Sequence, residues 1–123
     1  MNAAPPAMDP ARSPADSART ATGLKWAALH DTANAVAALA GVVPGCETEV
    51  LDFAAVMRGA TLSRGELAER GVEDMAAVIE PALSALLGAE VRGIDPGAAA
   101  RALWREFTAA RAAILALSPS ACA

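Results

Sequence analysis

The chain has 123 residues, of which 54% are hydrophobic and 3% aromatic, and its formal net charge is -4. This length provides one modest core, and an acidic chain offers no basic surface for nucleic acid or anionic lipid. No apolar run approaches the ~20 residues that span a bilayer, and the first residues lack the basic start and apolar block of a signal peptide. We therefore expect a cytoplasmic protein with neither nucleic acid nor membrane as a partner.

Residues 1–23 are rich in Pro, Ala and Ser and almost free of bulky apolar side chains. Such a segment cannot offset its ordering entropy by burial, which predicts a flexible leader. Beyond it, apolar side chains recur at helical spacing and predict a first helix over residues 24–41; these are Leu24, Leu29, Val36 and Leu39. The Val-Pro-Gly sequence at residues 43–45 ends this helix.

A second, short helix is predicted over residues 47–58. Acidic residues at its start and Arg58 at its end suit the helix dipole. Its apolar residues are spaced i, i+3, i+4 and i+7: Val50, Phe53, Ala54 and Met57.

The third helix is predicted to begin within residues 62–67, where Ser63 and Glu66 match the S-x-x-E capping box and Leu62 and Leu67 are placed for a hydrophobic staple. Its apolar stripe continues to Gly88. The pattern favours one bent helix, with a division near Gly71 or before Pro81 as the alternative.

The fourth helix is predicted to begin at Asp95 and Pro96, which supply a cap and a first-turn proline, and to stop at Ser118 and Pro119. No segment alternates like a strand. Short connections between helices favour opposite directions for neighbours, so the sequence predicts an all-α, compact four-helix bundle, largely antiparallel. The helical domain covers residues 24–118, and residues 119–123 form a frayed tail.

The aromatic residues are few enough that each is expected to anchor the core: Trp26, Phe53, Trp104 and Phe107. Arg111 follows Phe107 by one helical turn. It is expected either to lie across the rings of Trp104 and Phe107, to pair with a carboxylate, or to extend along the flank of the helix with its charge in water; the last is the favoured interpretation.

The only histidine, His30, is followed by Asp31 and, one turn later, by Asn34. On a helical wheel the core arc centres near Val36 and Leu29, which places His30 on the outward face. An exposed imidazole can act as a nucleophile or base, although an ordinary solvated polar face explains the same pattern.

This His-Asp-x-x-Asn sequence resembles the phosphoacceptor box of histidine kinases. The resemblance implies that His30 accepts a phosphoryl group, that Asp31 is its general base, and that Asn34 positions water or the partner's phosphoaspartate. It covers about one helix. No Gly-rich nucleotide-binding half follows, and Ala33 and Asn34 occupy the places of Lys and Gly in the His-x-x-Lys-Gly pattern of stand-alone phosphotransfer bundles. The resemblance therefore implies a phosphotransfer or phosphatase-like bundle without a kinase domain.

Other reactive constellations are not found in the sequence. One histidine cannot supply a di-iron site, no P-loop or Gly-x-Ser-x-Gly sequence occurs, and Cys46 and Cys122 are too far apart to suggest a metal pair or a disulfide framework. We therefore expect no metal, no cofactor and, more simply, no intrinsic catalysis.

The leading hypothesis is a small acidic protein–protein interaction module: an adaptor, regulator or assembly factor whose partner is another protein or a second copy of the chain. Its basis is a set of apolar residues that fall off the predicted core arcs, where they form either a partner-binding patch or part of a broad Ala-rich packing. These residues are Leu51, Val56, Leu87 and Leu115.

Overall fold

The structure, a computed structural model, describes residues 14–119, and its regular elements are all helical. The α-helices are α1 (Pro14–Ala40), α2 (Phe53–Val56), α3 (Leu62–Val91) and α4 (Gly97–Leu115), with a 3-10 turn, η1 (Cys46–Thr48), between α1 and α2. No strand occurs within residues 14–119. The predicted all-α fold with four helices is confirmed, with α2 reduced to a single turn.

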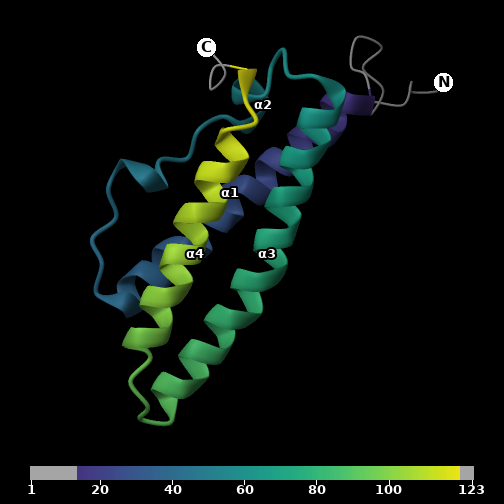
Figure 1. The fold of residues 1–123 in the computed structure, drawn as a ribbon. Coiled ribbons are helices and arrows are strands. Elements are labelled where there is room, and N and C mark those ends of the chain that lie inside the picture. Colours follow the sequence, from purple (N-terminus) through teal and green to yellow (C-terminus); the bar gives the residue numbers. More distant parts are fainter. Residues whose placement is uncertain (1–13, 120–123) are drawn as a thin grey trace, which may run out of the picture.

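The three long helices lie side by side (Figure 1), and each packs against the other two. Helix α4 runs antiparallel to both α1 and α3. Helices α1 and α3 run parallel to each other because the connection over residues 41–61 returns along the whole length of the bundle before α3 begins. Helices α3 and α4, which residues 92–96 join, are antiparallel as a short connection predicts, whereas α1 and α3 are parallel.

Helix α1 begins at Pro14, well before the predicted start at residue 24. Proline suits a first helical turn because that turn needs no N–H there and the ring fixes a helical φ. Thr22 is 6% exposed, so this added segment reaches the bundle. Residues 14–23 therefore belong to the helix and not to a flexible leader; the rest of the predicted leader, residues 1–13, lies outside the described residues.

Helix α1 ends in a Schellman motif. The Gly41 N–H donates to the Ala38 carbonyl at 3.2 Å, and the Val42 N–H donates to the Ala37 carbonyl at 2.9 Å. Gly41 has φ 71°, the left-handed conformation that this motif requires and that glycine adopts without a Cβ clash.

The predicted helix over residues 47–58 is wrong in extent. Only Phe53–Val56 is α-helical, with Asp52 as its N-cap accepting from the Ala55 N–H at 3.4 Å. Glu49 and Asp52 have extended backbone angles. The apolar spacing still places Phe53 and Met57 in the core, but Val50 is 50% exposed. The pattern identified buried positions correctly without requiring a continuous helix between them.

Helix α3 begins at Leu62, inside the predicted stretch but two residues before the first helical position that a Ser63 cap implies. Thr61 is the N-cap, and its Oγ1 accepts from the Arg64 N–H at 3.3 Å. Ser63 already lies inside the helix, so it cannot form the predicted capping box. Leu62 and Leu67 are 66% and 54% exposed, which also argues against the staple.

The remaining boundaries of α3 and α4 differ by a few residues. Helix α3 is continuous through Gly71 and Pro81, as favoured, and extends past Gly88 to Val91. At the start of α4 the Asp95 carboxylate accepts from the Gly97 N–H at 2.9 Å, but Pro96 occupies the N-cap position, so the predicted Asp95 cap and first-turn proline are each one residue too early. The helix ends at Leu115, before the predicted stop at residue 118.

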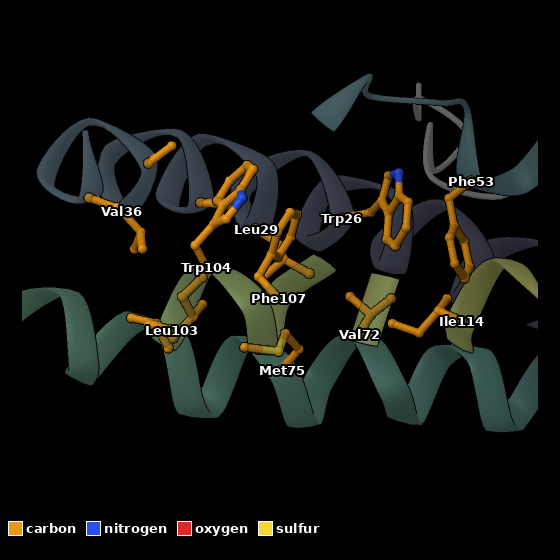
Figure 2. Packing of buried hydrophobic residues seen from close by; sticks show 14 of the residues in the cluster. Trp26, Leu29, Val36, Phe53, Val72, Met75, Leu103, Trp104, Phe107 and Ile114 are labelled. Atoms are coloured by element: carbon orange, nitrogen blue, oxygen red, sulfur yellow. The ribbon is translucent and has the colours of Figure 1, made fainter. Parts of the chain in front are cut away.

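The core forms where the three long helices meet and continues beneath α2. The four predicted aromatic anchors are confirmed, because each is at most 8% exposed. Figure 2 shows Phe53 packing beside Trp26 at one end of this cluster and Leu103 and Trp104 facing Val36 toward the other. Helix α3 contributes the opposite wall: Ala68, Val72, Met75 and Ile79.

Candidate functional site

His30 lies in the interior of the bundle, with 0% of its surface exposed. The sequence prediction of an outward-facing imidazole is therefore wrong. The predicted core arc, centred on Leu29 and Val36, does not include Trp26, although Trp26 is itself a predicted core anchor. Residues i and i+4 lie on the same helix face, so a buried Trp26 places His30 in the core as well. The missing signal was present in the sequence.

Two hydrogen bonds fix the protonation state of His30. Its Nδ1 lies 2.7 Å from the Trp26 carbonyl oxygen, and the Arg111 Nε–H donates to its Nε2 at 3.0 Å. A guanidinium group has donors only, so Nε2 must accept and carries no hydrogen. The hydrogen is then on Nδ1, which donates to the carbonyl. His30 is thus a neutral imidazole with both nitrogens engaged.

The surroundings of the ring also favour the neutral form. Burial lowers the pKa of His30 below its ordinary value of 6.5, and the nearby Arg111 charge lowers it further. The hydrogen bond to the Trp26 carbonyl and the charge of Asp31 act in the opposite direction. The rings of Trp26 and Phe107 enclose the imidazole, with centroids 4.5 Å and 5.3 Å away.

Arg111 joins three parts of the chain. From α4 it donates to His30 on α1, and its terminal NH2 nitrogen donates to the Glu49 carbonyl oxygen at 2.7 Å. Its guanidinium carbon lies 5.8 Å from the centroid of the Trp26 ring. Arg111 is only 9% exposed, so the favoured prediction of a flank residue is wrong. It does lie against an aromatic ring, but that ring belongs to Trp26 instead of Trp104 or Phe107.

We call His30, Arg111 and the Glu49 carbonyl the polar clasp. Its contacts explain why the backbone at Glu49 is extended instead of helical. In a helix the Glu49 carbonyl would accept from the N–H four residues later, whereas here it accepts from Arg111. The clasp holds the returning connection against α1 and α4, and this is a structural task.

The three residues of the histidine-kinase resemblance are not brought together as a reactive group. Asp31 and Asn34 are exposed, whereas His30 is buried. A phosphoacceptor needs a ring nitrogen that a phosphodonor can reach, and both nitrogens of His30 are engaged inside the bundle. This arrangement does not favour phosphotransfer through His30, which stays a prediction. If a phosphodonor labels His30→Gln with acid-labile phosphate as well as it labels the unmodified chain, phosphotransfer through His30 is excluded.

The four apolar residues predicted to bind a partner do not form one patch. Val56 and Leu115 are partly buried and pack against the core, as the broad-packing interpretation expects. Leu51 is partly buried and lines a small pocket between the start of α1 and residues 51–54. Leu87 is 45% exposed and lies in the last turns of α3, at the end of the bundle opposite α2 (Figure 1).

A different apolar surface lies between α3 and α4, and the sequence prediction missed it. It is a groove of about 530 Å³ lined by Gly71, Asp74, Met75, Val78, Glu106, Ala109, Ala110, Ala113, Ile114 and Leu117. The small side chains come mainly from one side of α4, at a spacing of three or four residues. Such a stripe of alanines gives little contrast against an Ala-rich background, which is why pattern analysis overlooked it.

Gly71 sets the close approach of the two helices beside this groove. A Cβ atom at this position would lie 2.8 Å from Cγ1 of Ile114. The absence of a side chain at Gly71 therefore makes room for the Ile114 side chain, and the shorter alanine side chains of α4 form the wall next to it.

The two sides of the bundle that α1 forms carry different contacts from those of this groove. The connection over residues 49–60 covers the side where α1 meets α4, through the Arg111 contact with Glu49 and the packing of Phe53 on Trp26. The side where α1 meets α3 carries an ion pair between Lys25 and Glu73, with Nζ and Oε1 3.6 Å apart. The groove between α3 and α4 is lined mainly by apolar side chains and is open to solvent.

Comparison with protein-family models, curated proteins and solved structures gives no match to this chain. Among the described helices, none is both long and apolar enough to cross a membrane. Residues 14–119 also bring together no group of three or more His, Cys, Asp or Glu side chains that could hold a metal ion. Cys46 is an exposed, free thiol, and Cys122 lies outside the described residues.

Proposed function

We propose that this chain is a protein–protein interaction module that binds its partner in the groove between α3 and α4. The observation that carries the proposal is the groove itself, an open and predominantly apolar surface between two of the three long helices. Large exposed apolar patches on small proteins are often sites of interaction.

The distribution of polar groups supports binding in preference to catalysis. The one buried histidine and the one buried arginine hold the fold together, and both ring nitrogens of His30 are already hydrogen-bonded. The groove contains two carboxylates, Asp74 and Glu106, and otherwise only apolar side chains and glycine. A nucleophile with its own base is not present among these lining residues.

The rest of the fold keeps the groove in shape. Helices α3 and α4 form its two walls, and α1 packs behind both of them. The polar clasp ties α4 to α1 and to the connection on the far side. A surface that is already ordered before binding loses less conformational freedom when a partner arrives, which favours affinity.

Site-specific photocrosslinking tests this proposal. A photoreactive amino acid is placed at Ala113, which is exposed and lines the groove, and in a matched control at the adjacent Ala112, which is exposed but does not line it. Successive residues of a helix point about 100° apart, so the two probes sample different surfaces. In the cells that make this protein, we expect a protein adduct at Ala113 in excess of any at Ala112. Equal or absent adducts at the two positions would refute docking in this groove.

A further inference from the structure

We infer that the occupant of the α3–α4 groove is an amphipathic helix of another protein, with large apolar side chains on one face and Lys or Arg at the margins of that face. This inference rests on the proposed function and adds the chemistry of the partner. It follows from the shape of the groove, from the sizes of its lining residues, and from the charges at its margins.

The shape of the groove fits a helix. Its two walls come from antiparallel helices, residues 71–78 of α3 and residues 106–117 of α4 and the turn that follows it. An amphipathic helix binds such a groove through apolar residues at i, i+3, i+4 and i+7. Bound there, it would be a fourth long helix in the bundle.

The lining residues call for large side chains from the partner. The α4 wall is formed by Ala109, Ala110 and Ala113, which present little more than methyl groups. Larger apolar side chains, including Val78 and Leu117, lie around them. Close packing of this surface therefore needs Leu, Ile, Met or Phe from the partner to fill the space above the alanines.

The charges at the groove select the sign of the partner. Asp74 from α3 and Glu106 from α4 are its only ionisable lining residues, and both are exposed carboxylates. The chain as a whole is also acidic, with a net charge of -4. Complementary Lys or Arg residues on both margins of the incoming helix would pair with these carboxylates, speed association and fix the register.

The same charges disfavour a second copy of the chain as the occupant. A symmetric dimer formed through this groove would bring the Asp74 and Glu106 side chains of both copies into one interface, where like charges repel. A basic helix from another protein has no such conflict.

The binding experiment uses the full chain and two designed helical peptides. The peptides share one apolar face of Leu and Ile and differ only in the residues beside that face, which are Lys and Arg in the first and Glu in the second. Fluorescence anisotropy of labelled peptide gives the dissociation constants at low and at moderate salt. We expect the basic peptide to bind about tenfold more tightly than the acidic one at low salt, and the ratio to shrink at higher salt because exposed charges are screened.

Two charge-reversal variants locate the selectivity. Asp74→Lys combined with Glu106→Lys is expected to invert the preference toward the acidic peptide. The matched control combines Glu80→Lys with Glu90→Lys, at two exposed positions of α3 outside the groove, and makes the same change in net charge. The control is expected to retain the preference of the unmodified chain. Circular dichroism verifies that both variants are as helical as the original.

The outcomes separate this inference from the proposed function. The inference is overturned if the unmodified chain shows no preference for the basic peptide, and equally if it binds neither peptide. It is also overturned if both double variants lose the preference equally. A third contrary result would be a dimer, seen by light scattering, that dissociates in the Asp74→Lys, Glu106→Lys variant but not in the control variant. A protein adduct at Ala113 together with any of these results would leave the proposed function in place, with an occupant of different chemistry.

Discussion

Removing the guanidinium group of Arg111 tests the polar clasp most directly. Arg111→Met keeps an unbranched apolar stem but removes the donors to His30 Nε2 at 3.0 Å and to the Glu49 carbonyl at 2.7 Å. A buried acceptor left without its donor costs about 1–3 kcal/mol, and the fully buried ring nitrogen of His30 incurs this in full. The Glu49 carbonyl lies near the surface, where water can replace the donor, so its loss adds about 1 kcal/mol.

The two losses sum to about 2–4 kcal/mol, and the measured loss should lie in the lower half of this range, because removing the desolvation cost of a buried charge offsets part of the damage. Urea unfolding followed by tryptophan fluorescence reports it well, since both tryptophans, Trp26 and Trp104, are buried. A second substitution, His30→Leu, completes a double-mutant cycle. Either single variant leaves one polar group of the pair buried without its partner, whereas the double variant removes both.

We therefore expect the double variant to be more stable than the sum of the two single losses indicates, by about 1–3 kcal/mol. Additivity to within about 0.5 kcal/mol would refute the idea that the two side chains stabilise the fold as a pair. A loss below about 1 kcal/mol in Arg111→Met would show that the arginine is a flank residue, as the sequence pattern suggested.

The pKa of His30 is lowered in the folded chain, so the unfolded chain binds this proton at a higher pH. The free energy of unfolding is therefore complete above pH 6.5 and falls as the pH drops below it. The contribution of His30 to the slope of unfolding free energy against pH cannot exceed about 1.4 kcal/mol per pH unit, and this contribution should be absent in His30→Gln. Gly71→Ala should destabilise by about 1–2 kcal/mol in thermal or urea unfolding, because its Cβ would lie 2.8 Å from an Ile side chain. In the same helix Gly88→Ala should stabilise by about 0.5–1 kcal/mol, since its nearest neighbour is the mobile end of an Arg side chain at 3.4 Å, and equal effects at the two glycines would contradict this packing. Thr61→Ala should cost about 1 kcal/mol and Ser63→Ala much less, and the reverse order would restore the predicted capping box.

The sequence by itself determined the features that depend on local structure. Helical periodicity and the absence of strand patterns specified an all-α fold, and the start of α3 was placed to within two residues, although the capping side chain is Thr61 instead of Ser63. The aromatic anchors were also found, because large apolar side chains are buried in almost any compact arrangement of these helices. Each of these features follows from properties of a residue and its near neighbours.

Only the tertiary structure decided the position of His30, the conformation of residues 49–52 and the open groove. In an Ala-rich helix the hydrophobic arc is broad, because alanine is tolerated on either face, so the wheel does not define one inner side. The extended backbone at Glu49 is stabilised by an arginine 62 residues away, and no local pattern records such a partner. The groove exists because Gly71 lets α3 approach Ile114 closely while the neighbouring alanines leave space, which is a relation between two helices and not a property of either sequence alone.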